Sequence, residues 1–63
     1  MQASTPNGDI EIRYQEQRFY AILRINNQVV YISDLFHSKA AAAIAAQAMN
    51  ERYRNNFLSA SLL

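Results

Sequence analysis

Three residues with the side chains of a hydrolytic site lie within one short stretch of the chain. Asp34, His37 and Ser38 supply a carboxylate, an imidazole and a hydroxyl, the groups used in nucleophilic catalysis. A triad needs these groups oriented from separate elements, and closeness along one loop provides no such orientation. We therefore interpret His37, the single histidine, as a loop residue, and we predict no catalytic residues and no enzymatic activity.

Metal and cofactor chemistry has equally little support. One histidine and no cysteine leave no recognisable set of metal ligands. We predict no metal, no cofactor and no small-molecule substrate. A chain of 63 residues has a small core, and without disulfides or a metal it has oligomerisation as its remaining reinforcement.

The charge balance argues against a nucleic acid or a membrane as the main partner. Six Lys and Arg against five Asp and Glu give a net charge of +1, far from the basic footprint of a phosphate-binding protein. The longest apolar run, residues 40–46, is too short to cross a bilayer. Residues 1–8 lack the basic and apolar regions of a secretion signal. We expect a cytoplasmic protein with no membrane contact.

Alternating residues predict three antiparallel strands after a flexible lead over residues 1–8. Apolar and polar residues alternate from Asp9 to Gln15, and two further, mainly apolar runs occupy residues 19–25 and 29–32. The pair Asn26 and Asn27 suits a two-residue type I′ loop, because Asn tolerates positive φ. This loop sets Leu23 opposite Val30, with Arg24 opposite Val29.

An alanine-rich segment predicts a single helix after the strands. Ser38 is a favourable N-cap, and the helix is expected from Lys39 to Arg54, with Asn55 and Asn56 as its exit. We predict an α+β fold, a three-stranded antiparallel sheet with one C-terminal alanine-rich helix packed on one face (β-β-β-α). The domain covers residues 9–56, and an apolar C-terminal tail, residues 57–63, either tucks under the helix or reaches a partner.

The predicted register divides the side chains between two sheet faces, both of them rich in apolar residues. The face against the helix collects Ile10, Ile12, Tyr14, Phe19, Ala21, Leu23, Ile25, Val30 and Ile32. The opposite face collects Glu11, Arg13, Tyr20, Ile22, Arg24, Val29 and Tyr31. On the helix, the expected contact stripe is Ala41, Ile44, Ala45, Ala48 and Met49.

The order of residues from Phe19 to Tyr53 resembles the YegP-like family of small uncharacterised domains. The likeness is carried by ISDLFHSKAAA at residues 32–42, by the alternation over residues 19–23 and by the Asn-containing hairpin, although this hairpin lacks the family's usual glycine. The resemblance implies a unit of three antiparallel strands and one helix. Because such units often occur in tandem or as pairs, it also implies a homodimer, and it implies no reaction.

The same order of elements is similar to the AP2-type and integrase arm-type DNA-binding domains, whose strands read the major groove. This alternative assigns nucleic-acid contacts to Arg13, Arg24 and Tyr31. In those domains the outward positions of the second and third strands are rich in Arg, Glu and Trp. Here three of the four matching positions are Ile22, Val29 and Tyr31, so the fold carries over more safely than the function.

The second apolar face therefore leads to the main functional prediction. We predict a small non-enzymatic protein-interaction module that self-associates, or binds a larger protein, through Tyr20, Ile22, Val29 and Tyr31. Charged residues at the rim of this face are Glu11, Arg13 and Arg24. DNA binding through the sheet is the alternative, and a small phage-type inhibitor of a host or defence protein is a further one.

Overall fold

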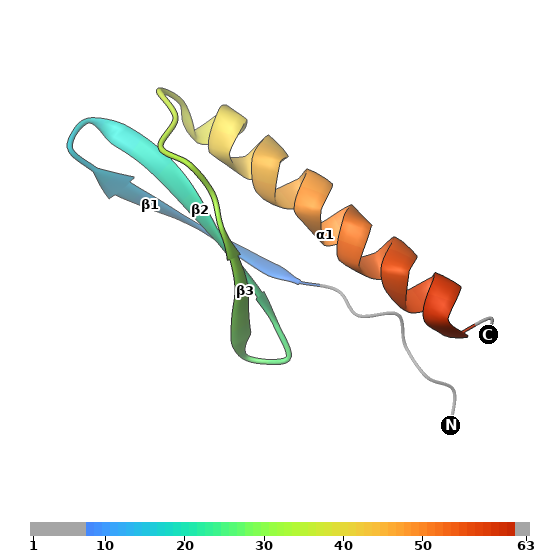
Figure 1. Ribbon diagram of the computed structural model, residues 1–63. Helices are drawn as coiled ribbons and strands as arrows, with labels where there is room; N and C mark the ends of the chain where they lie inside the picture. Colours follow the sequence, from blue (N-terminus) through green and yellow to red (C-terminus); the bar gives the residue numbers. More distant parts are fainter. Residues whose placement is uncertain (1–7, 62–63) are drawn as a thin grey trace.

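The protein folds as a three-stranded antiparallel sheet with one long helix across one face. The computed structural model describes residues 8–61, and side chains only as far as residue 56. The strands are β1 (Asp9–Gln15), β2 (Arg18–Ile25) and β3 (Gln28–Ile32), in the order β1-β2-β3, and the helix is α1 (Lys39–Ser61). Figure 1 shows α1 lying along one side of the sheet. The predicted β-β-β-α architecture is confirmed.

Both hairpins use two-residue turns in the left-handed region of backbone space. Asn26 and Asn27 have φ of 55° and 64°, as predicted for a type I′ loop. Glu16 and Gln17 adopt the same conformation, with φ of 50° and 66°, although their residue types do not favour it. The first hairpin consequently pairs β1 with β2 without interruption from Asp9↔Arg24 to Gln15↔Arg18.

The pairing of β2 with β3 departs from the predicted register because of a β-bulge. Arg24 pairs with Val29 as expected, but the register then shifts, so that Leu23 pairs with Tyr31 instead of Val30. In the next pair, Ile22 lies opposite Ile32. Because of the bulge, Tyr31 and Ile32 lie on the opposite sides of the sheet from those predicted. Tyr31 is on the helix side, and Ile32 is on the side away from the helix.

Hydrogen bonds beyond β3 hold the shifted register. The N–H of Ser33 donates to the carbonyl of Ala21 (2.9 Å), and the Ser33 hydroxyl accepts from the N–H of Ala21 (2.8 Å). Farther along, Phe19 and Phe36 exchange two backbone hydrogen bonds of 2.7 Å. The chain leaving β3 thus stays bound to β2 after the strand itself has ended.

The helix begins where predicted and ends later than predicted. Ser38 is confirmed as its N-cap, because its side-chain oxygen accepts from the N–H of Ala41 (3.1 Å). The expected end at Arg54 is wrong, since the helical backbone continues through Ser61 and takes in the first five residues of the predicted apolar tail. The side chains of that tail lie outside the described residues.

The expected helix stripe is also wrong, because α1 is rotated relative to it. Ala42 and Ala46 are fully buried against Ala21, whereas Ile44 is exposed. The space around these methyl groups is filled from the sheet side by Ile10, Ile12, Phe19 and Phe36. Large side chains therefore come from the sheet and its exit loop, and the helix contributes mainly methyl groups.

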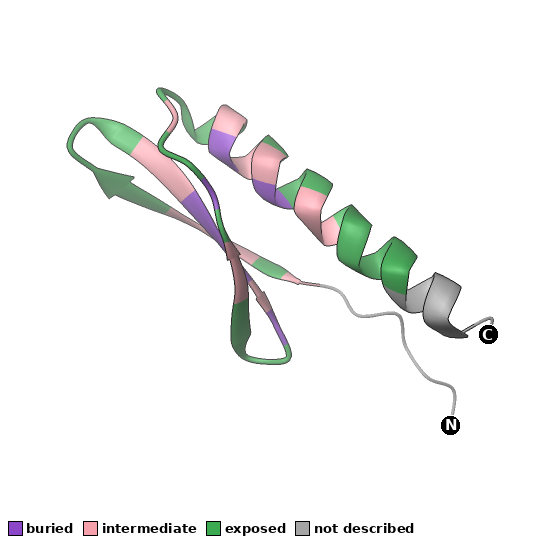
Figure 2. Ribbon diagram, viewed as in Figure 1, coloured by how far each residue is buried: buried purple, intermediate pink, exposed green. Residues whose placement is uncertain are grey.

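The core that results is small. Leu23 is the only large side chain that is fully buried among the described residues, and Figure 2 shows the buried positions confined to β2, the loop after β3 and the first half of α1. Gly8, the last residue of the predicted lead, is packed at the edge of this core and donates its N–H to Asn50 Oδ1 (3.1 Å). Within the described part of the chain, no helix has the length and apolarity to span a membrane.

Candidate protein-binding surface

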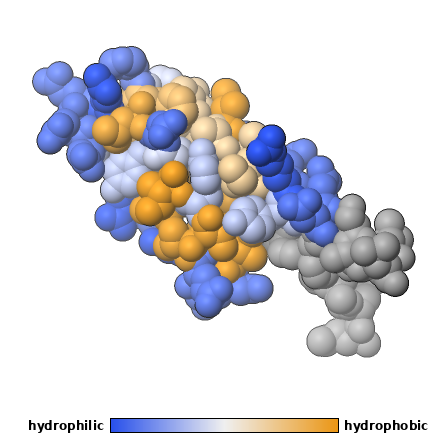
Figure 3. Space-filling model, in the orientation of Figure 1, coloured by the Kyte–Doolittle hydropathy of each residue, from blue (hydrophilic) through white to orange (hydrophobic). Residues whose placement is uncertain are grey.

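The sheet face opposite α1, here called the outer face, carries a group of exposed aliphatic side chains. Ile32 is 59% exposed and Val29 50%, and Leu35, in the loop after β3, is 39% exposed. Tyr20 lies beside them, half-buried. Figure 3 shows apolar side chains gathered over β3 and bounded by hydrophilic atoms at the tip of the β2–β3 hairpin. We call Tyr20, Val29, Ile32 and Leu35 the outer patch.

This patch keeps two of the four apolar residues predicted for it and loses two. Tyr20 and Val29 lie on the outer face as expected. Ile22 also lies there, but it is only 8% exposed, so it supports the sheet and offers little surface to a partner. Tyr31 is wrongly placed by the prediction, because the bulge pairs it with Leu23 on the helix side.

Ile32 and Leu35 are the functional candidates that sequence reasoning missed. The bulge turns Ile32 outward, and Leu35 follows it in a loop for which no face was predicted. Together with Tyr20 they line a shallow hollow of about 340 Å³, completed by Gln15 and Ser33. The sequence does indicate that the faces of these residues are uncertain. Residues 29–32 contain no polar residue, so they do not alternate and cannot specify which side faces the core.

The three predicted rim charges form one ion-pair network on the outer face. Glu11 Oε1 accepts from Arg24 Nη1, and Glu11 Oε2 accepts from Arg13 Nε, both at 2.7 Å. Arg24 comes from β2 and the other two residues from β1, so the network links the strands across their register. It carries a net charge of +1 and lies beside the outer patch, because Arg13 pairs with Tyr20 and Arg24 pairs with Val29.

The network changes the proton affinities of Glu11 and Arg13. The hydrogen bond from Arg24, followed by that from Arg13, holds the pKa of Glu11 below its ordinary value. The Glu11 carboxylate in turn raises the pKa of Arg13. Both arginines therefore share one ionised carboxylate, and each has less unpaired charge available for a phosphate.

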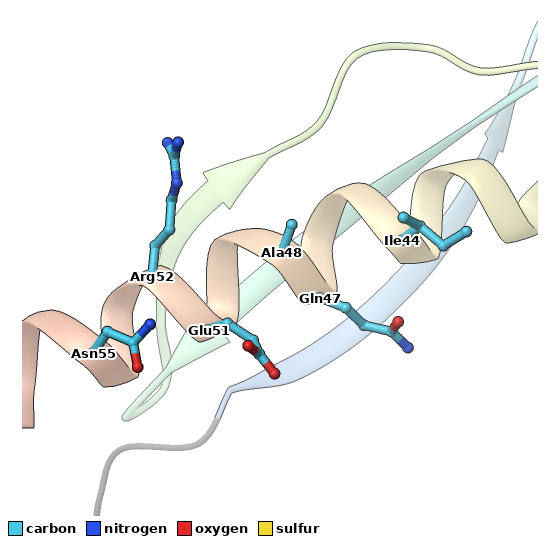
Figure 4. Close-up of a pocket in the computed structure, with 6 residues that line it drawn as sticks. All are labelled: Ile44, Gln47, Ala48, Glu51, Arg52 and Asn55. Atoms are coloured by element: carbon cyan, nitrogen blue, oxygen red, sulfur yellow. The ribbon is translucent and has the colours of Figure 1, made fainter.

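A second hollow, of about 440 Å³, lies on the solvent side of the helix (Figure 4). All of its lining residues belong to α1: Ile44, Gln47, Ala48, Glu51, Arg52 and Asn55. In Figure 4, Gln47 leaves the helix toward the side of β1, whereas Arg52 points to the side of β3. Because no other element forms an opposing wall, this surface offers no enclosed site.

The residues considered for catalysis and metal binding do not come together. The Ser38 side-chain oxygen is engaged in the helix cap, and no hydrogen bond joins His37 to Asp34 or Ser38 in the described structure. Among the described residues, no three His, Cys, Asp or Glu side chains are grouped as metal ligands. The outer face is therefore the best-supported candidate for function.

Comparison with models of known protein families, with curated proteins and with solved structures finds no match to this chain. The resemblances to the YegP-like family and to the DNA-binding domains stay predictions. We therefore infer function from the geometry of the outer face and of the sheet edges.

Proposed function

We propose that the protein is a small non-enzymatic interaction module that binds another protein through the outer patch. One observation carries the proposal: Val29, Ile32 and Leu35 are exposed together on one side of a chain whose described core fully buries a single large side chain, Leu23. Scattered apolar residues are normal on a surface, but adjoining ones beside a hollow are typical of a protein-binding site.

The charges beside the patch favour a partner of a different sequence over a second copy. The network of Glu11, Arg13 and Arg24 is net positive, so two outer faces placed against each other would bring like charges together. A partner with an apolar centre and an acidic rim is complementary to this surface. Self-association through the outer face stays a prediction, and site-specific photocrosslinking also tests it.

The alternative of DNA binding is weakened at all three of its expected contacts. Tyr31, one of the expected contacts, is on the helix side of the sheet. Arg13 and Arg24 both bind Glu11, so a phosphate would have to compete with a carboxylate already in place. A salt titration with random duplex DNA tests this alternative, and we expect no measurable affinity even at low salt.

Site-specific photocrosslinking in cells that naturally make the protein tests the outer patch. A photoreactive residue at position 35 should give one discrete covalent adduct, and a second substitution, Ile32→Glu, should abolish it. The matched control carries the photoreactive residue at position 48, on the solvent side of α1. Equal adducts from positions 35 and 48, or none from position 35, would refute the proposal, and an adduct of twice the chain mass would identify a second copy as the occupant.

A further inference from the structure

The two edges of the sheet differ in how they are protected. The β3 edge is short and bulged, and its Val30 carbonyl accepts a hydrogen bond from the Tyr53 hydroxyl of the helix (3.3 Å). The β1 edge is seven residues long and carries neither a bulge nor a proline. In the described part of the chain it has no strand on its outer side (Figure 1). Long, regular edges of this kind invite another strand.

The hydrogen bonds of β2 identify which β1 groups face this open edge. Phe19 and Ala21 direct their N–H and C=O groups toward β3 and the chain that follows it. The alternate residues Tyr20 and Ile22 therefore direct theirs toward β1, where their partners are Arg13 and Glu11. It follows that the backbone groups of Ile10, Ile12 and Tyr14 point to the free edge.

We propose that this edge binds the same edge of a second copy of the chain, antiparallel and centred on Ile12. In this register Ile12 lies opposite Ile12 of the second copy, and Ile10 lies opposite its Tyr14. All three residues are those whose backbone groups face the edge, so each pair exchanges two N–H···O bonds. The register also overlaps the whole of β1, because Asp9 then lies opposite Gln15 of the second copy.

Charge on the outer face selects this register over its neighbours. Centring on Ile12 sets Glu11 directly opposite Arg13 of the second copy, and Arg13 opposite its Glu11. Centring on Ile10 would instead set Glu11 opposite Asp9, a pair of like charges. Centring on Tyr14 would leave only residues 13–15 of each strand paired. The strand is thus complementary to itself in one register.

The helix side of the sheet is compatible with the same arrangement. Tyr14 is 64% exposed, with one side of its ring against Phe19 (5.2 Å between centroids), and Ile10 of the second copy would cover it. Asn50, which accepts a hydrogen bond from Gly8, lies on the flank of α1 above β1. Gln47 and Ala43 precede it on the same flank by one and two helical turns. These side chains are short or uncharged, so two helices can approach without repulsion.

The dimer would be one continuous sheet with both helices on one face and both outer patches on the other. The inference goes beyond the proposed function, because edge pairing leaves each outer patch free for another protein. It predicts a bivalent surface in which two patches bind one partner, or two copies of it, with increased avidity.

Sedimentation velocity of the full chain, from low micromolar to several hundred micromolar, tests the edge. We expect a reversible dimer, and the single reversals Arg13→Glu and Glu11→Arg should each weaken it about tenfold or more by opposing like charges. A mixture of the two reversed chains should recover the affinity, because each then faces its complement. A synthetic chain N-methylated at Ile12 should be monomeric while keeping the wild-type circular dichroism spectrum, since that N–H does not bond to β2.

Ile32→Glu is the matched control, because it alters the outer patch and leaves the β1 edge unchanged. It should dimerise like the wild type while losing the photocrosslink at position 35. The edge dimer and the outer patch can therefore be refuted independently of each other. A wild type that stays monomeric throughout the range would overturn the edge dimer. So would a dimer that Ile32→Glu abolishes and N-methylation of Ile12 leaves intact, since the second copy would then occupy the outer face.

Discussion

Replacing Ser33 with alanine should destabilise the fold far more than the loss of one small polar side chain suggests. The Ser33 hydroxyl accepts a hydrogen bond from the N–H of Ala21 (2.8 Å) and donates one to the carbonyl of Asp34 (2.9 Å). Ala21 is fully buried and Ser33 is 8% exposed, so water has no easy access to the N–H that Ser33→Ala leaves unpaired. The perturbation therefore isolates one buried donor with almost no change in volume.

The magnitude follows from the cost of an unsatisfied buried group. Leaving a buried donor without a partner costs about 1–3 kcal/mol, so we expect a loss of about 2 kcal/mol. A domain of this length has a free energy of unfolding of about 3–9 kcal/mol at typical values per residue. The midpoint of thermal unfolding should accordingly fall by about 8–16 °C, at about 4–8 °C per kcal/mol for a small domain.

Urea and thermal unfolding followed by circular dichroism measure this loss, at one fixed low concentration because association would add to the apparent stability. Ser33→Thr is the control, since it keeps the hydroxyl, and hydrogen exchange of the Ala21 amide should accelerate in Ser33→Ala alone. A Ser33→Ala variant within about 0.5 kcal/mol of the wild type would refute the reasoning, as that is the range of an unremarkable surface substitution. Equal losses in the two variants would refute it as well.

Three further substitutions test other parts of the structure. Gly8→Ala should cost about 1–3 kcal/mol in urea unfolding, because its Cβ would overlap Cδ1 of the fully buried Leu23, and an unchanged midpoint would contradict this packing. Gln17→Gly should stabilise by about 0.5–1 kcal/mol, since it relieves a side chain held at φ 66°, and a loss of stability would argue against that strain. Arg24→Gln should raise the pKa of Glu11 toward its ordinary value of 4.5 in an NMR titration, and no change in the Glu11 titration would show that Arg24 is not the main cause. Because the pKa of Glu11 is lowered in the folded protein, the ion pairs of Glu11 stabilise the fold fully above pH 4.5, and this stabilisation is lost as the pH falls through the lowered pKa.

Local chemistry predicts the elements of this fold well. Strict alternation over residues 9–15 specifies β1 and its face, and Asn26 with Asn27 specifies the second turn. The Ser38 cap and the alanines after it specify the start of α1. In each case the decisive interactions are between residues close in sequence, so they can be inferred without knowing the tertiary contacts. The end of α1 was missed because Asn55 and Asn56 tolerate helix as well as the left-handed exit, and neither is a glycine.

The composition of the candidate site could be predicted only where polar residues alternate. Glu11 and Arg13 are separated by Ile12, and this pattern places both charges on the outer face, where the structure has them. In β3 every residue from Val29 to Ile32 is apolar, so a slip of one position buries as much apolar surface as it exposes. The register there is decided by contacts with residues far away in the sequence.

The filling of the core explains why the bulge favours an exposed Ile32. Without the bulge, Ile32 would lie opposite Ala21 and point toward the helix, into space already occupied by Phe36 beside Ala42 and Ala46. With the bulge, Ser33 supplies both hydrogen bonds to Ala21, so the exchange leaves no buried backbone group of Ala21 unpaired. The apolar surface on the outer face is therefore a consequence of core packing. The methyl groups of the helix allow it to lie close to the sheet, and Phe36 fills the space that remains. Ile32 consequently points to the outer face, where a partner can cover it.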